Sequence, residues 1–127
     1  MKLALAVVSA ITLAAANAAV AAPAAAPKCF MTQQITGHAI ANERTLYLRV
    51  GGKSVYRAEM SNNCFGGASP SDPITIAPRG SSSVCGEQDL NVGATLNGGG
   101  LSSRCIVDKL TKLTPAEAAA LPKGAKP

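Results

Sequence analysis

Four cysteines are the residues of this chain whose type and spacing bear most directly on chemistry. Cys29, Cys64, Cys85 and Cys105 lie 35, 21 and 20 positions apart. Zinc sites and thiol-redox sites usually contain a C-x-x-C motif or a close relative, and the sequence has none. His38 is the only histidine that would help to complete a metal site. The spacing therefore favours two structural disulfides over a metal or redox centre, and it implies no cofactor.

His38 is also the one candidate for general acid–base chemistry near neutral pH. The sequence contains no serine in a G-x-S-x-G motif that would act as a nucleophile beside it. Glu87 and Asp89 provide two carboxylates after Cys85, whereas calcium takes roughly six to eight oxygen ligands. We interpret His38 as a surface or strand-edge residue and the two acids as turn residues. The expectation is a protein that is not an enzyme, with a hydrolase as the less favoured alternative, and with no catalytic or metal site.

A basic group of side chains lies in the segment that most clearly predicts a β-hairpin. Residues 45–50 and 54–60 alternate in polarity on either side of Gly51 and Gly52. A two-residue turn would divide the apolar side chains between both faces. A three-residue loop, 50–52 or 51–53, instead places all of them on one face, so this register should prevail. The apolar face would then hold Leu46, Leu48, Val50, Tyr56, Ala58 and Met60.

The opposite face of this hairpin would carry Tyr47, Arg49 and Arg57, with Arg44 and Lys53 nearby. These side chains suggest a contact patch for anionic glycans, lipid headgroups or an acidic protein. The simpler interpretation, which we favour, is a solvated strand face on which arginine stacks over tyrosine. Nucleic acid is not an expected partner, since the net charge is only +5 and aromatic residues make up 3% of the chain.

The elements that position these residues follow an export signal. Lys2 is followed by an apolar stretch, Leu3 to Leu13, and then by small residues, as in a secretory signal peptide. The motif Ala19-Val20-Ala21 favours cleavage after Ala21, so residues 1–21 form the signal peptide; cleavage after Ala18 is the alternative. Retention as a membrane anchor is less favoured, because the stretch is mostly alanine, and no stable span is expected after cleavage. An exported chain with an even number of cysteines is expected to oxidise them in pairs.

The remainder of the chain is predicted to hold one domain. Residues 22–28 are rich in alanine and proline and predict a flexible segment. Residues 29–121 predict a single β-rich domain, and residues 122–127 a disordered tail. Thr114 to Glu117 forms a capping box with proline at the first helical position, so a short helix should continue to Leu121. The predicted strands are 35–41, 45–50, 54–60, 74–77, a strand around 90–92, and 104–111.

About six short strands with turn-rich connections predict a mainly β fold, a small antiparallel barrel or sandwich. If successive strands alternate up and down, Cys29 and Cys85 lie at one end and Cys64 and Cys105 at the other. The pairs Cys29–Cys85 and Cys64–Cys105 are therefore favoured over the other two connectivities. Each disulfide should contribute on the order of 3–4 kcal/mol to a core with no tryptophan and few aromatic residues.

The order of cysteines and strands also resembles a known family. The residues that carry the resemblance are Cys29-Phe30, the run Arg44 to Val50, Tyr56, Val84-Cys85-Gly86, Asp89 and Arg104 to Val107. They resemble a family of small exported proteobacterial proteins with four cysteines that is catalogued as a domain of unknown function. The resemblance covers roughly Cys29 to Leu113. It implies a bacterial source and an envelope or secreted location, and it implies no activity.

These expectations together describe a periplasmic or secreted β-domain that acts by binding, as an interaction or envelope-associated module. Its partner would be an envelope protein or an anionic glycan or lipid. The alternatives are a binder of an anionic envelope component through the basic hairpin face and an inhibitor of a secreted hydrolase.

Overall fold

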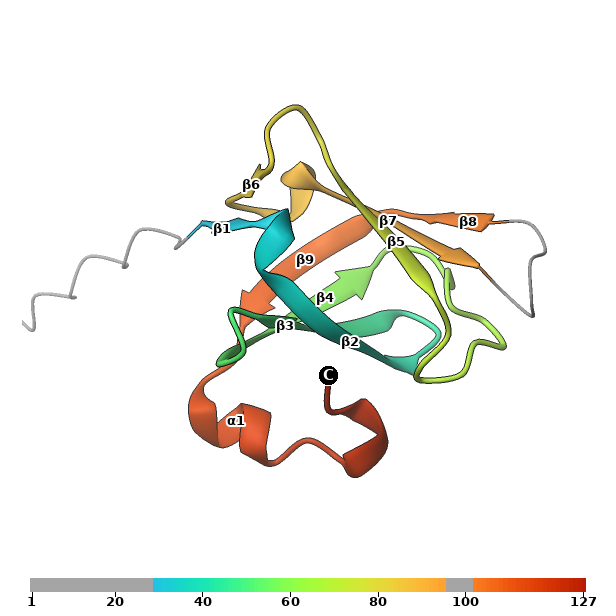
Figure 1. Ribbon diagram of the computed structural model, residues 1–127. Coiled ribbons are helices and arrows are strands. Elements are labelled where there is room, and N and C mark those ends of the chain that lie inside the picture. The colour runs from blue at the N-terminus through green and yellow to red at the C-terminus, as the bar shows by residue number, and fades with distance from the viewer. Residues whose placement is uncertain (1–28, 96–101) are drawn as a thin grey trace, which may run out of the picture.

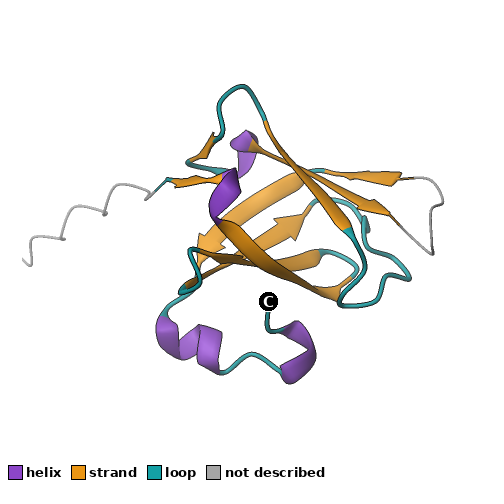
Figure 2. Ribbon diagram, viewed as in Figure 1, coloured by secondary structure: helices purple, strands orange, loops and turns teal. Residues whose placement is uncertain are grey.

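The computed structural model describes residues 29–95 and 102–127 (Figure 1). Antiparallel strands dominate the described residues, and the only helices are short, so the mainly β class with a C-terminal helix is confirmed (Figure 2). The strands are β1 (Phe30–Met31), β2 (Ile35–Asn42), β3 (Thr45–Val50), β4 (Ser54–Met60), β5 (Ile74–Pro78), β6 (Ser83–Val84), β7 (Leu90–Thr95), β8 (Ser102–Cys105) and β9 (Val107–Lys112). The helical elements are α1 (Pro115–Ala119) and three 3₁₀ turns, η1 (Thr32–Gln34), η2 (Glu87–Asp89) and η3 (Lys123–Ala125).

The strands form three antiparallel sheets. Four strands pair in the order β2-β3-β4-β9, three in the order β5-β7-β8, and the short strands β1 and β6 pair with each other. No pairing joins the four-stranded sheet to the three-stranded sheet, so the barrel that we considered is not closed. β2 therefore lies at one edge of the four-stranded sheet, and β5 lies at one edge of the three-stranded sheet.

The hairpin of β3 and β4 has the predicted register. Leu48 lies opposite Tyr56, and Val50 opposite Ser54, which leaves the three-residue loop 51–53. Gly51 and Gly52 adopt φ values of 61° and 74°, a region in which glycine avoids the clash that a Cβ atom would cause. All six side chains predicted for the apolar face are buried.

The core lies between this face and the three-stranded sheet. Leu90, Val92 and Ala94 of β7 belong to the same buried cluster as the hairpin residues. Phe30 from β1 packs its ring 4.7 Å from that of Tyr56. Residues of all three sheets belong to this cluster. Side-chain packing in the core therefore joins the sheets, which share no backbone pairing with one another.

The prediction of one last strand over 104–111 was wrong, because the chain changes sheets at Ile106. β8 pairs with β7, whereas β9 pairs with β4. At the corner, the Asn62 side chain donates to the Arg104 carbonyl (3.2 Å) and accepts from the Ile106 N–H (3.3 Å). The Ile106 carbonyl accepts from the Ser61 N–H at 2.9 Å. Residues 61–62 thus supply hydrogen-bond partners for the backbone groups of Arg104 and Ile106 at the point where the chain leaves the β7–β8 pair.

We expect Asn62→Ala to lower the free energy of unfolding by roughly 1–2 kcal/mol, because two hydrogen bonds at the corner are lost. Urea unfolding of the oxidised protein measures the change. The adjacent exposed residue Asn63 provides the control variant, Asn63→Ala, which should leave the free energy within about 0.5 kcal/mol of the parent. Equal effects of the two substitutions would contradict a role of Asn62 in the corner.

The C-terminal segment (113–127) lies across the outer face of the four-stranded sheet. α1 begins with the predicted capping box, since the Thr114 hydroxyl accepts from the Glu117 N–H at 3.2 Å. α1 then contacts β4, and η3 contacts β2 (Figure 1). Residues 122–127 are therefore not the disordered tail that we predicted: Ala125 is buried, and a Cβ at Gly37 would lie 3.3 Å from the carbonyl carbon of Pro127. The missing side chain at Gly37 leaves room for this packing.

Candidate functional site

The four cysteines form the two favoured disulfides. Cys29 is bonded to Cys85 with a Cα–Cα distance of 4.2 Å, and Cys64 to Cys105 with 5.2 Å. Cys64 and Cys105 are each 1% exposed, whereas Cys29 and Cys85 lie at the surface. All four sulfur atoms are therefore engaged in holding the fold.

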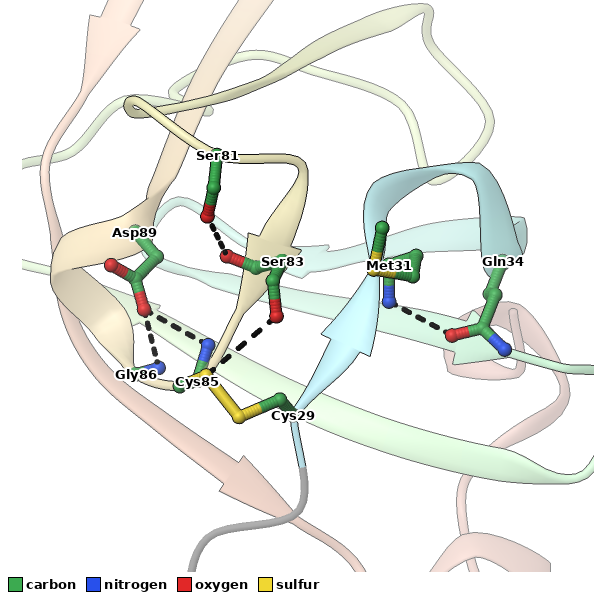
Figure 3. The surroundings of a disulfide bond; sticks show 8 residues. All are labelled: Cys29, Met31, Gln34, Ser81, Ser83, Cys85, Gly86 and Asp89. Carbon is green, nitrogen blue, oxygen red and sulfur yellow. Dashed lines mark hydrogen bonds between the residues drawn. A yellow bond between two sulfur atoms is a disulfide. The ribbon is translucent and has the colours of Figure 1, made fainter.

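Asp89, considered above as a calcium ligand, organises the turn beside the exposed disulfide (Figure 3). Its carboxylate accepts from the N–H groups of Cys85 (2.9 Å) and Gly86 (3.1 Å). Within residues 29–95 and 102–127, no group of three or more His, Cys, Asp or Glu side chains is gathered as a metal ion would require. The position of Asp89 thus agrees with the turn role that we inferred from the sequence.

His38 lies on β2, an edge strand, and its ring is half-buried. Its Nε2 atom is 2.9 Å from the carbonyl oxygen of Asp72. Because a carbonyl can only accept, Nε2 carries the proton and donates it in this contact. The histidine therefore ties β2 to the loop that precedes β5, which is the strand-edge role expected of it.

The predicted contact patch is assembled on the outer face of the hairpin. Tyr47 lies directly opposite Arg57 across the β3–β4 pair, and Arg49 lies opposite Val55. Arg57 Nε is 3.9 Å from Glu59 Oε1, and these side chains are 36% and 41% exposed. Such an exposed pair is worth at most about 1 kcal/mol. Among the described residues, the Nε atoms of Arg49 and Arg57 are buried and have no hydrogen-bond partner.

The two further basic residues considered with the patch do not join it in the same way. Arg44 donates from Nε to the carbonyl of Met60 at 3.0 Å and from Nη2 to that of Ser61 at 3.3 Å, so its guanidinium group supports the start of the corner. Lys53 is exposed in the hairpin loop. The compact part of the patch is thus Tyr47, Arg49 and Arg57.

The C-terminal segment partly covers this patch, which the sequence did not predict. A hollow of about 270 Å³ remains between the hairpin and α1, lined by Tyr47, Arg57, Leu113, Glu117, Ala120 and Leu121. Its volume lies just below the usual range for small-molecule sites, about 300–1,000 Å³. The segment therefore leaves the arginine face only half-exposed.

The charge of Glu117 makes the stability of this C-terminal segment depend on pH. The Thr114 N–H, which donates to Glu117 Oε2 at 2.7 Å, lowers the pKa of the Glu117 carboxyl, with smaller contributions from the Thr114 hydroxyl and the charge of Arg57. A carboxylate with a lowered pKa stabilises the fold above its usual value of 4.5 and loses that contribution as the pH falls through the lowered value.

We therefore expect Glu117→Ala to reduce the thermal midpoint at pH 7 and to differ progressively less from the parent chain as the pH falls below 4.5. Calorimetry of both chains from pH 7 to pH 3 measures the difference. Glu87→Ala removes a carboxylate that takes part in no capping box, and it serves as the control. A Glu117→Ala difference that stays constant over this range would contradict the capping role.

A second hollow lies between the edge strands β2 and β5, and its volume is about 330 Å³. It is lined from β2 by Ile35 and His38, among others, and from β5 by Ile74 and Ile76. No sequence pattern identified it, because it depends on which strands end the two sheets. A third hollow of about 370 Å³ lies beside Arg44, Glu59 and Asp108.

None of the helices in the described part of the chain is long and apolar enough to cross a bilayer. Comparison of the whole chain with family models, with curated proteins and with solved structures finds no match in any of the three.

Proposed function

We propose that this protein is an exported β-domain that acts by binding rather than by catalysis, as an interaction or envelope-associated module in the periplasm or outside the cell. One observation carries the proposal: the side chains best suited to catalysis are used to hold the fold. The cysteines are paired, His38 donates to Asp72, and Asp89 accepts two backbone N–H groups. The signal-like residues 1–21 and the family resemblance support export from a bacterial cell.

Protein recovered from its native host tests the export part of this proposal. We expect an N-terminus at Ala22 and no sulfhydryl that reacts with an alkylating reagent. A chain that keeps Met1 and has four reactive sulfhydryls would overturn it, since the disulfides require an oxidising compartment.

A hydrolase screen tests the non-enzymatic part. The parent chain and His38→Ala are assayed together, after thermal unfolding has shown that both are folded. No activity in either chain agrees with the proposal. Equal activity in both chains would exclude His38 as the catalytic residue and would still contradict a protein that acts by binding alone. Activity that His38→Ala loses while remaining folded would assign catalysis to His38 and contradict it.

Binding of an anionic envelope component is the second candidate, and the observation that favours it is the half-exposed outer face of the β3–β4 hairpin, which Tyr47, Arg49 and Arg57 share. Guanidinium groups bind phosphate and carboxylate with paired hydrogen bonds. Vesicles containing acidic lipid, and separately lipopolysaccharide, serve as probes at low and high salt.

The parent chain should bind these probes at low salt and release them at high salt, because exposed charge interactions are screened. Arg49→Ala/Arg57→Ala should weaken binding strongly. Arg79→Ala/Arg104→Ala removes the same charge from exposed positions away from the hairpin and is the matched control. Equal binding by the two double variants would count against the hairpin face.

A further inference from the structure

We infer that residues 114–127 form a removable cover over the arginine face (Tyr47, Arg49 and Arg57), and that an acidic lipid surface binds this face once the cover has moved away. The inference rests on the second candidate function, the binding of an anionic envelope component, and adds how that binding is controlled. α1 and η3 lie on the side of the four-stranded sheet that faces away from the three-stranded sheet (Figure 1).

The cover is attached to the sheet by few contacts. Of residues 114–127, all of which the structure describes, only Ala125 is buried. Among the described residues, every hydrogen bond of this cover joins two of its own residues. The Ala118 N–H donates to the Thr114 carbonyl, for example, and the Ala125 N–H to the Pro122 carbonyl. One small side chain, rather than a backbone ladder, therefore fixes the cover to the strands beneath it.

The cover is attached to the rest of the chain at Leu113. This residue is buried, and its N–H donates to the Val55 carbonyl at 2.9 Å, so it still belongs to the sheet. Four buried residues on this side lie outside the main core cluster, namely Ala39, Val55, Leu113 and Ala125. Loss of the Ala125 contact therefore leaves the main core intact. A segment with so few buried apolar contacts opens at a lower cost than the whole fold.

The cover occupies the place that an outside anion would take. The hollow of about 270 Å³ has Tyr47 and Arg57 of the hairpin on one side and Glu117 and Leu121 of the cover on the other. The charge of Arg57 contributes to the lowered pKa of the Glu117 carboxyl. The cover thus brings a carboxylate of the same chain into the field of an arginine that would bind the outside anion. It competes with such a ligand both by its position and by its charge.

The side chains of the arginine face indicate what would bind to it. Arg49 lies opposite Val55, and Arg57 opposite Tyr47, so cationic and apolar or aromatic groups alternate over one face. Glu59 Oε1 lies 3.9 Å from Arg57 Nε and already balances part of that charge. Guanidinium groups bind phosphate with paired hydrogen bonds, and tyrosine suits the boundary between headgroups and acyl chains. We therefore commit to a lipid surface that bears phosphate headgroups.

The test compares two substitutions within the cover of the oxidised chain. Ala125→Gln places a larger, polar side chain at the one buried position and so favours the open state. Ala119→Gln makes the same change at an exposed position of α1 and is the matched control. Both variants keep the charges of Lys123 and Lys126, which a truncated chain would lose. Vesicles that contain phosphatidylglycerol in a neutral lipid are the probe, and vesicles of the neutral lipid alone are the blank.

Ala125→Gln should bind the acidic vesicles at least about tenfold more tightly than Ala119→Gln, because apparent affinity rises with the fraction of molecules in the open state. Adding Arg49→Ala/Arg57→Ala to Ala125→Gln should abolish this gain.

Gly37→Val gives an independent result, since a Cβ at Gly37 would lie 3.3 Å from the carbonyl carbon of Pro127. A valine there displaces the end of the cover from the strand side, and it should also raise the affinity. Hydrogen exchange shows whether the cover opens separately: in the parent chain, the amides of Ala118 and Ala120 should exchange faster than those of β3, and they should exchange faster still in Ala125→Gln.

Two results would overturn the cover and leave the binding function standing. One is equal, arginine-dependent affinity of Ala125→Gln and Ala119→Gln for the acidic vesicles. The other is exchange of the Ala118 and Ala120 amides as slow as that of β3, which would mean that the cover opens only when the whole domain unfolds. Failure of the function itself has a different result: no variant, Ala125→Gln included, would bind acidic vesicles more tightly than neutral ones, and the inference would fall with it.

Discussion

Replacing both cysteines of the buried disulfide, Cys64→Ala/Cys105→Ala, should lower the thermal midpoint by about 20 °C or more. The bond closes a loop with a sequence separation of 41, and releasing it adds roughly 4 kcal/mol of conformational freedom to the unfolded chain. For a domain of this size, each kcal/mol corresponds to about 4–8 °C. Both cysteines are also only 1% exposed, so loss of their sulfur atoms removes packing beside the corner where the chain changes sheets.

The second disulfide provides the control for this prediction. Cys29→Ala/Cys85→Ala opens a separation of 56, which by loop length alone costs slightly more. Its cysteines are exposed, so no core packing is lost with it. We therefore expect the buried pair to be the more costly one in calorimetry of the two oxidised variants. Equal or reversed shifts would show that the corner does not depend on Cys64–Cys105.

Phe65→Ala should lower the free energy of unfolding by roughly 3–5 kcal/mol, the range for deleting a buried aromatic ring. Phe65 is 1% exposed and is among the largest fully buried side chains of the described residues. It belongs to the Ser-, Asn- and Gly-rich segment after β4, where its N–H donates to the Glu43 carbonyl at 3.0 Å. The ring therefore anchors a connection that lacks regular secondary structure.

Urea unfolding of Phe65→Ala measures this loss, and Ile106→Ala is the control. Ile106 is apolar but 55% exposed, so its truncation should change the free energy by no more than about 0.5 kcal/mol. If Phe65→Ala were as mild as Ile106→Ala, the loop would not be part of the core, and the core would consist of the strands alone.

The hairpin shows what the sequence by itself determined. Strict alternation over residues 45–60 admits one register that buries all the apolar side chains, since a shift of one residue would turn them to solvent. The capping box at Thr114 and Glu117 depends only on residues three apart, and it too formed as predicted. The disulfide pairs were predicted from the order of strands and cysteines and are the pairs observed, although Cys105 ends β8 and does not open the last strand. Each of these features depends on local periodicity or on the simple reversal of successive strands.

The remaining features were decided by the tertiary structure. The division of 104–111 at Ile106 depends on Asn62, which lies more than 40 positions earlier and supplies the hydrogen bonds that allow the chain to leave its ladder. The ordering of 122–127 depends on the space above Gly37. The hollow between β2 and β5 depends on which strands end the two sheets. Contacts between segments distant in sequence leave no periodic pattern in either segment, because each is favourable only once the other is in place.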